Sequence, residues 1–258
     1  MDANGNEQFI LQFASLCRGE ELLEENIRVG NADQNTIVPP LKPGQDLEPL
    51  ELYRCSSSLG APRGTWPPTP YTGLWKTFRF THTKVAELKA QASALCSLDS
   101  DVKYISSDDA VSTFIWTRIA TIRSAWLPED SNTMLFRAVN GRRKLDPEIP
   151  AGYMGHSILM WPTKLPIQNV INDALSLTTI KVRRSLMEVN DAHMRSFFYL
   201  LQNEKDKTTV NYGAKVNGKT DMLITSFVAQ KLYKTNFGDV LGEPVSNSGE
   251  AWMCHKPR

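Results

Sequence analysis

Apolar residues recur at three- and four-residue spacing in several segments, and this spacing predicts helices. The first predicted helix is amphipathic, covers residues 5–18 and stops at Gly19. A strand-like alternation over 74–80 precedes a second helix over 83–95. The run 106–109 then offers side-chain acceptors for the free amides of a third helix start. The chain therefore combines strands and helices.

Later runs continue this mixture of helices and strands. Two helices and three strands are predicted there, without a regular period and without an internal repeat. The mixture indicates an α/β fold. The strands are expected over 134–139, 157–161 and 222–227, and the helices over 167–179 and 191–203.

A proline-rich stretch separates the first helix from the rest. Residues 31–73 hold eight of the fifteen prolines. Proline cannot donate a hydrogen bond to a sheet, so this stretch is expected to be a long extended connection. Connections of this length usually run over a surface or join two lobes.

Composition narrows the class of protein. The 258 residues are 41% apolar and 22% charged, enough to bury a substantial core. A net charge of +1 gives no basic stripe for a phosphate backbone, so we expect no nucleic-acid partner. No stretch approaches the roughly 20 apolar residues of a membrane span, and the polar start does not resemble a signal peptide. We therefore expect no membrane contact and a cytoplasmic location.

The four cysteines are scattered. They form no C-x-x-C pair, so neither a disulfide framework nor a zinc site is expected, and buried free thiols are the simplest interpretation. They are Cys17, Cys55, Cys96 and Cys254.

Five segments carry a resemblance to one family. In chain order they are similar to the end of an H-x-x-M-D-G signature, an I-S-x-N-D-A-L…F-I-W helix, a V-D-x-R…P-x-x-P-x-G-Y-x-G-N block, an I-T-S-W strand and a D-F-G-x-G-L-G-K-P loop. These motifs are typical of the BAHD superfamily of acyl-CoA-dependent acyltransferases, in the branch that includes fungal trichothecene acetyltransferases. The segments are residues 1–5, 105–116, 137–155, 224–227 and 236–244.

The resemblance implies an incomplete lobe of the chloramphenicol acetyltransferase type, an α/β fold with a mixed sheet and flanking helices. It divides the chain into a remnant helix of an N-terminal lobe (1–30), a proline-rich crossover (31–73) and an incomplete C-terminal lobe (74–258). The implied reaction moves an acyl group, expected to be acetyl, from acyl-CoA to a hydroxyl of a secondary metabolite such as a trichothecene-like terpenoid. Acyl-CoA is then a co-substrate, and no cofactor stays bound.

The resemblance also assigns residues. Asp2 matches the motif aspartate, whose role in the family is structural and which pairs with an arginine that is Arg142 here. The basic turn at 142–144 could meet the phosphates of coenzyme A, although such a turn could equally be solvated. The residues expected to contact coenzyme A are Arg142, Arg143, Thr225, Ser226, Phe237 and Gly238.

The base that the reaction needs is the open question. A histidine with a pKa near neutrality suits removal of the hydroxyl proton, but the motif histidine would precede Met1. Two hypotheses follow: the true polypeptide extends upstream to that histidine, or this chain is catalytically dead and serves as a binder or partner. Under both hypotheses this chain alone is expected to be catalytically inactive. It is expected to be a monomer, or a fragment that needs an N-terminal lobe. The histidines present are His82, His156, His193 and His255, of which only His156 lies in a family motif.

A glycine-rich segment suggests a third hypothesis. Residues 213–220 fit G-x-x-x-x-G-K-[ST], the phosphate-binding loop of nucleotide triphosphatases. That loop needs a helix directly after it, whereas 222–227 reads as a strand. Asn217-Gly218 between apolar runs is a better match to a hairpin turn.

Overall fold

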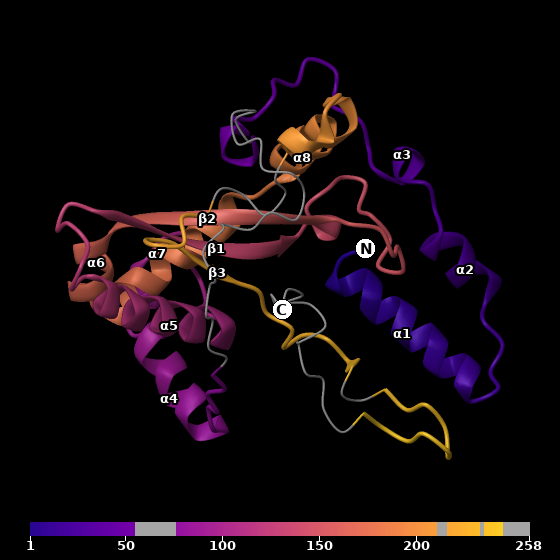
Figure 1. The fold of residues 1–258 in the computed structure, drawn as a ribbon, viewed down its shortest axis with the longest axis horizontal. Helices are drawn as coiled ribbons and strands as arrows, with labels where there is room; N and C mark the ends of the chain where they lie inside the picture. The colour runs from indigo at the N-terminus through magenta and orange to yellow at the C-terminus, as the bar shows by residue number, and fades with distance from the viewer. Residues whose placement is uncertain (55–75, 211–215, 233–234, 245–258) are drawn as a thin grey trace, which may run out of the picture.

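A three-stranded mixed sheet forms the centre of the computed structural model (Figure 1). The central strand β1 (Asn132–Asn140) pairs antiparallel with β2 (Ile158–Pro166) over its whole length. On its other side it pairs in parallel with the short β3 (Met222–Ile224). The predicted α/β class and mixed sheet are confirmed. The structure describes residues 1–54, 76–210, 216–232 and 235–244.

Helices cover both faces of this sheet. Neighbouring residues of a strand point to opposite faces, and Leu135 and Phe136 of β1 are both completely buried. Leu135 packs in a cluster with Trp116, whereas Phe136 packs in a different cluster with Phe197. Each face of the sheet therefore carries its own apolar core, as expected for a strand buried on both sides.

One group of helices gathers at the end of the sheet that lies on the left of Figure 1. Its central member, α5 (Ser107–Arg123), begins with a reciprocal capping box between Ser106 and Asp109. Further along α5, the buried Trp116 indole donates a 3.0 Å hydrogen bond to Thr133 Oγ1 at the start of β1. Its neighbours are α4 (His82–Ser93), α6 (Ile167–Asn172) and α7 (Leu175–Glu188).

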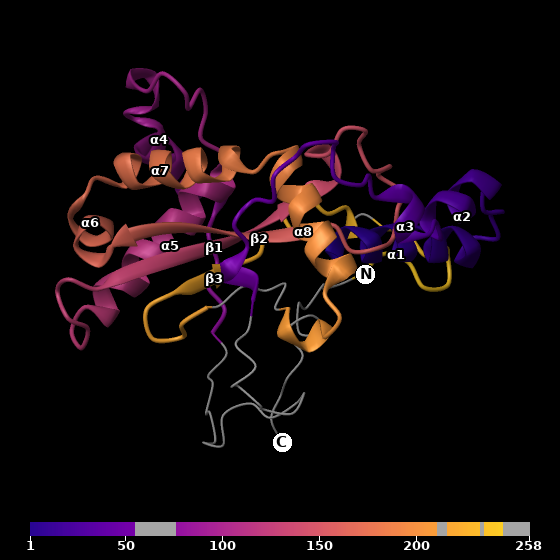
Figure 2. The same ribbon diagram turned by 90° about the horizontal axis from the view of Figure 1, so that it is seen from above.

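The remaining helices lie toward the other end (Figures 1 and 2). α8 (Asp191–Asn203) holds the described part of the crossover: Ser196 Oγ accepts a 3.0 Å hydrogen bond from the Glu48 amide, and Lys42 pairs with Asp191 at 2.8 Å. Short helices interrupt this crossover and the loops. The other elements are α1 (Ala3–Cys17), α2 (Glu24–Gly30), α3 (Gln34–Ile37) and the 3-10 turns Glu51–Tyr53, Cys96–Leu98, Gly141–Arg143 and Lys207–Thr209.

Most predicted elements are confirmed, with two corrections. The helix predicted over 167–179 is two helices, because Asp173 and Ala174 have extended backbone angles between α6 and α7. The strand predicted over 74–80 is wrong in its described part: residues 76–80 form no strand and are exposed, so their alternation does not reflect a buried face. Residues 74–75 lie outside the described part. The boundaries of the three predicted domains stay a prediction.

Within the described ranges, no helix is long and apolar enough to cross a membrane.

Candidate functional site

Asp2 caps the N-terminus of α1 and is buried at the same time. Its Oδ1 accepts a 2.8 Å hydrogen bond from the backbone N–H of Gly5, which is the usual geometry of an aspartate at a helix start. Its Oδ2 accepts a 2.8 Å bond from the backbone N–H of Ser157, just before β2. Only 4% of the residue is exposed. One carboxylate therefore joins α1 to the central sheet.

Arg142 completes this arrangement from the turn after β1. Its Nη1 lies 2.8 Å from Asp2 Oδ2 and its Nη2 lies 3.1 Å from Asp2 Oδ1, a bidentate ion pair. Nη2 also donates to the carbonyl oxygens of Tyr153 and Gly155, at 3.0 and 2.8 Å. The ion pair that the resemblance implied is therefore present, and both side chains are almost completely buried.

The surroundings keep Asp2 ionised. Burial by itself raises the pKa of Asp2, but the hydrogen bond from Arg142, the backbone bonds from Gly5 and Ser157, and the charge of Arg142 outweigh it, so the pKa is lowered. A buried carboxylate with four hydrogen bonds, two of them from a guanidinium partner, can stay charged. We name Asp2 and Arg142 with their backbone partners Gly5, Tyr153, Gly155 and Ser157 the carboxylate lock.

The lock changes the expectation for the basic turn. Arg142 is 2% exposed and directs its guanidinium inward, so it is not placed to meet a phosphate group at the surface. Arg143 in the same 3-10 turn is exposed. Arg143 is therefore the arginine of this turn that we still expect to contact coenzyme A, and this contact stays a prediction.

Thr225 and Ser226 follow β3 and are exposed. Because β3 runs parallel to β1, with Ile224 opposite Arg137, these two residues continue toward the same end of the sheet as Arg143. The carboxyl ends of parallel strands are common places for ligands. The contact of Thr225 and Ser226 with coenzyme A stays a prediction.

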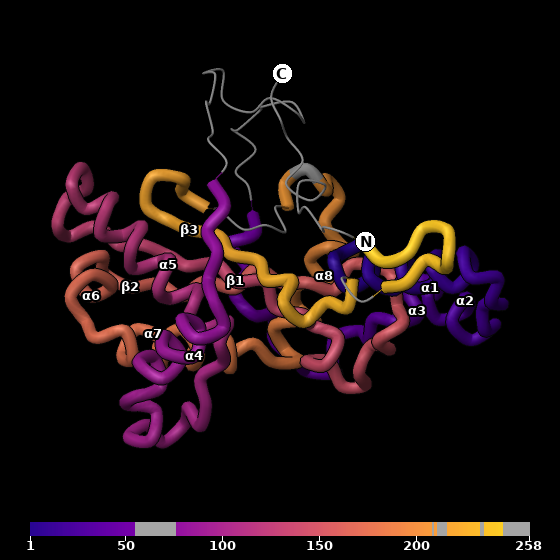
Figure 3. The backbone as a smooth tube through the Cα atoms, turned by 90° about the horizontal axis from the view of Figure 1, so that it is seen from below, coloured from indigo at the N-terminus to yellow at the C-terminus, as the bar shows by residue number. Residues whose placement is uncertain are grey.

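Phe237 and Gly238 belong to a closed loop beside α1. The Phe237 amide donates to the Gly242 carbonyl at 2.8 Å, and both Gly238 and Gly242 have positive φ, which favours glycine. The loop contacts the end of α1, because Arg18 donates to the Asn236 carbonyl and the Phe237 ring meets the helix. Figure 3 shows loop and helix side by side. A role of this loop toward coenzyme A is untested.

The described histidines occupy three different settings. His82 is exposed at the start of α4, and the ring of His193 contacts Trp161 edge-on and lies 2.9 Å from Asn190 Oδ1. His156 stands between Gly155 and Ser157, which both bond to the carboxylate lock; burial lowers its pKa, and the nearby charge of Asp2 offsets this in part. His255 lies outside the described residues.

The glycine-rich segment does not form a phosphate-binding loop in its described part. The Asn217 carbonyl accepts from the amides of Thr220 and Asp221 at 3.1 and 2.7 Å, so the predicted turn is present. The chain then enters β3 and not a helix, so it lacks the helix that a phosphate-binding loop needs directly after it. The hairpin itself stays a prediction, because residues 211–215, which would form its first strand, lie outside the described part. The nucleotide triphosphatase hypothesis is rejected; residues 213–215 lie outside the described part.

Cysteines and acidic residues form no metal centre in the described ranges. Cys96 is a buried free thiol, as expected, whereas Cys17 is an exposed free thiol, because it ends α1 on its outward side. Cys55 and Cys254 lie outside the described part.

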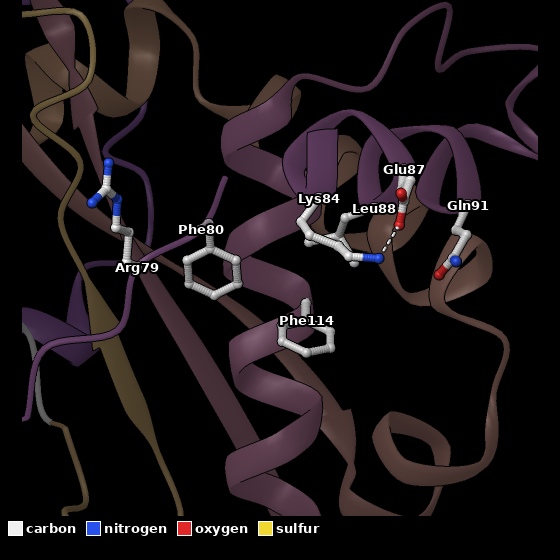
Figure 4. A pocket seen from close by; sticks show the side chains of 7 residues that line it. All are labelled: Arg79, Phe80, Lys84, Glu87, Leu88, Gln91 and Phe114. Carbon is white, nitrogen blue, oxygen red and sulfur yellow. Dashed lines mark hydrogen bonds and ion pairs between the residues drawn. The ribbon is translucent and has the colours of Figure 1, made fainter. Parts of the chain in front are cut away.

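Two features were not predicted from the sequence. The first is a buried charge cluster, in which Asp109 accepts from Arg183 and its Oδ1 lies 3.6 Å from Arg137 Nη1. The sequence showed Asp109 only as a helix cap, and its partners come from β1 and α7. The second is a surface pocket of about 290 Å³ against α4 and α5, lined by Arg79, Phe80, Lys84, Glu87, Leu88, Gln91 and Phe114 (Figure 4).

The fold of this chain is a mixed sheet covered on both faces, with a helix anchored to it by a buried carboxylate–arginine pair. The crystal structure of F. graminearum TRI101 with coenzyme A and deoxynivalenol matches 95% of this chain and 54% of that chain, with a TM-score of 0.79 and 24% identity. Vinorine synthase matches with a TM-score of 0.56 and 18% identity, over 95% of this chain and 49% of that chain. These likenesses show the fold.

The family follows from the sequence comparison. Residues 1–252 match the Transferase family, and the chain belongs to that family. This confirms the resemblance to the BAHD acyltransferases.

Curated relatives are similar over nearly the whole chain. An O-acyltransferase of Monascus ruber, pigD, is 32% identical over 94% of this chain and 53% of its own length. An O-acetyltransferase of Aspergillus niger, epaC, is 34% identical over 94% of this chain and 52% of its own length. The trichothecene 3-O-acetyltransferase TRI101 of Fusarium sporotrichioides is 29% identical over 95% of this chain and 52% of its own length. The chain spans about half the length of the curated relatives it matches.

Proposed function

We propose that this chain is one lobe of an O-acyltransferase that moves an acyl group, expected to be acetyl, from acyl-CoA to a hydroxyl group of a secondary metabolite. The family match and the names of the relatives support this reaction class. The solved TRI101 relative holds both coenzyme A and deoxynivalenol, which supports acyl-CoA as co-substrate and a terpenoid such as a trichothecene as acceptor.

The observation that carries the proposal is the carboxylate lock. In the resembling family the catalytic histidine lies shortly before the motif aspartate, so the lock would fix the direction of the backbone that holds this base. Asp2 is buried and bonded to two backbone amides and to Arg142, which leaves the start of α1 little freedom. A base must lie within hydrogen-bond reach of the hydroxyl it deprotonates, and a rigid anchor beside it secures that geometry.

Coenzyme A would be bound by residues at the end of the sheet near the lock. Arg143 offers an exposed guanidinium, which binds phosphate with two parallel hydrogen bonds. Thr225 and Ser226 offer exposed hydroxyl groups after β3, and the loop with Phe237 and Gly238 lies against α1. We propose these five residues as the coenzyme A contacts of this lobe.

We further propose that the 258-residue chain does not catalyse transfer by itself. None of the four histidines in the sequence lies in an H-x-x-x-D motif. His82 and His193 belong to α4 and α8, and His156 lies on the loop held by the lock. The alternative is that the chain serves as a catalytically dead binding remnant.

The test is an acetyl-transfer assay. The chain is incubated with acetyl-CoA and deoxynivalenol, and free thiol and ester product are measured by absorbance and mass spectrometry. A fusion places before Met1 the part of the Aspergillus niger relative that lies outside the match, where the resemblance leads us to expect the motif histidine. We expect turnover from the fusion and none from the chain alone. Turnover by the chain alone, or a fusion that binds coenzyme A without turnover, would contradict the proposal, and the second result favours the binding remnant.

The coenzyme A contacts are tested in the same fusion. Arg143→Ala should raise the KM for acetyl-CoA about tenfold, since a charge-assisted contact to phosphate contributes about 1.5 kcal/mol. Arg28→Ala is the matched control, because Arg28 is an exposed arginine that pairs with Glu25 on α2. An unchanged KM in Arg143→Ala would remove this residue from the site.

A further inference from the structure

The surface pocket of about 290 Å³ lies where α4 and the segment before it meet α5. Figure 4 shows Arg79 at one end of this pocket, Gln91 at the other, and the rings of Phe80 and Phe114 between them. The helices α4 and α5 lie at the left of Figure 1, whereas α1 lies at its right. We name the pocket of Figure 4 the α4–α5 pocket.

Two aromatic rings and a leucine form the apolar side of this pocket. The rings of Phe80 and Phe114 meet edge-on, with centroids 6.2 Å apart and planes at 89°. Leu88 is the one buried residue of the lining, and it belongs to the apolar cluster between α4 and α5. Aromatic rings favour offset or edge-to-face neighbours, so this side of the pocket suits a flat aromatic group.

The charges around the pocket are not balanced. The carboxylate of Glu87 is already paired with Lys84, whose Nζ lies 2.8 Å from Glu87 Oε2. The guanidinium of Arg118 lies 5.0 Å from the centre of the Phe114 ring, beside the pocket. Within the described ranges, neither Arg118 nor the lining residue Arg79 forms an ion pair with a carboxylate. Two positive charges therefore remain near the ring pair, and they favour an anion.

The volume of the pocket limits the ligand to one or two rings. Ligand pockets of proteins usually measure about 300–1,000 Å³, so this pocket is at the small end of that range. The guanidinium of Arg79 can hold a carboxylate with two parallel hydrogen bonds. A flat ring with one carboxylate therefore matches the size, the apolar side and the charge of the pocket.

We propose that the α4–α5 pocket binds a small aromatic carboxylate. The ring of this ligand packs against Phe80 and Phe114, and its carboxylate is held by Arg79. The inference does not rest on the proposed function, because none of the five residues proposed as coenzyme A contacts lines this pocket. Its test measures binding without catalysis.

The test titrates 2-naphthoate into the nitrogen-15-labelled chain and follows the backbone amide signals by NMR. A ligand of this size with the usual efficiency of small ligands should bind with a Kd of about 1 mM, and the amides of residues 79–91 should shift most. Arg79→Gln should weaken binding about tenfold, because it removes a charge-assisted contact. Phe114→Leu should weaken it about fivefold, because leucine offers no ring.

Each variant has a matched control. Phe78→Leu is the control for the ring, since Phe78 is 78% exposed and does not line the pocket. Arg28→Gln is the control for the charge, since Arg28 pairs with Glu25 on α2. Both controls should leave the Kd unchanged. Arg79 is exposed, so Arg79→Gln tests the proposal even if Phe114→Leu does not fold.

Two further ligands separate the possibilities. 2-Naphthylmethylammonium has the same rings with a positive charge and should bind about tenfold more weakly than 2-naphthoate; equal binding would overturn the proposal. If coenzyme A shifts the same amides and displaces 2-naphthoate, the pocket belongs to the co-substrate and the proposal is overturned. The absence of a saturable shift with 2-naphthoate, or a Kd that Arg79→Gln leaves unchanged, would overturn it too.

Discussion

Removing the charge of Asp2 should destabilise the whole lobe. In Asp2→Asn the helix cap can survive, because asparagine also accepts from the Gly5 amide. The two charge-assisted bonds from Arg142 lose their acceptor charge, and the new amide N–H groups meet other donors. Two such bonds contribute about 3 kcal/mol together, and loss of one partner of a buried pair costs about 3–5 kcal/mol. We expect the free energy of unfolding to fall by about 3 kcal/mol.

The measurement is urea unfolding of the full chain at pH 7, followed by circular dichroism. A loss of about 3 kcal/mol corresponds to a fall in Tm of roughly 6–12 °C for a protein of this size. Asp33→Asn is the matched control, because Asp33 caps α3 but is exposed and has no arginine partner among its described contacts. It should change the free energy of unfolding by no more than about 0.5 kcal/mol.

A double-mutant cycle isolates the pair itself. Arg142→Met keeps much of the side-chain volume and removes the buried charge, so the double variant should recover part of the stability lost in Asp2→Asn. We expect a coupling free energy of about 2 kcal/mol or more. If Asp2→Asn is no more harmful than Asp33→Asn, or if the coupling is close to zero, the lock does not hold the lobe together.

Two further predictions concern buried groups. Because burial lowers the pKa of His156 below its usual 6.5, the unfolded chain binds a proton that the folded chain does not; the free energy of unfolding should be highest above pH 6.5 and fall as the pH drops below it. His156→Asn should flatten this slope in urea titrations between pH 7.5 and 5, and an unchanged slope would assign it to other groups. Trp116→Ala should lower the free energy of unfolding by about 3–5 kcal/mol, as measured by thermal melts. The control Trp126→Ala, at a residue that is 63% exposed, should lower it by less than about 1 kcal/mol. Equal losses in the two variants would contradict the burial of Trp116 in the core.

Local signals in the sequence predicted much of the fold. The capping run at 106–109 placed the start of α5, and the spacing of apolar residues placed α8 at Asp191–Asn203. Both signals depend on residues within a few positions of each other. The break between α6 and α7 was missed, because Asp173 and Ala174 adopt extended angles that their residue types do not require.

The candidate site was predictable only where a motif carried it. Asp2 and Arg142 are 140 residues apart, and no spacing rule predicts that they pair. The family resemblance predicted this pair. The contacts of Arg183 with Asp109 had no such signal and were missed. The bonds from Arg142 to the carbonyl oxygens of Tyr153 and Gly155 were missed for the same reason, because no motif in the sequence indicates these acceptors.

The lock also sets an order of events during synthesis. One of the two backbone amides that donate to Asp2 belongs to Ser157, which is made 155 residues later. At about 5–20 residues per second, the ribosome needs roughly 8–30 s to supply it. Throughout that interval the start of α1 has no sheet to be fixed against, so the helix can be anchored only after the chain has been made as far as the start of β2.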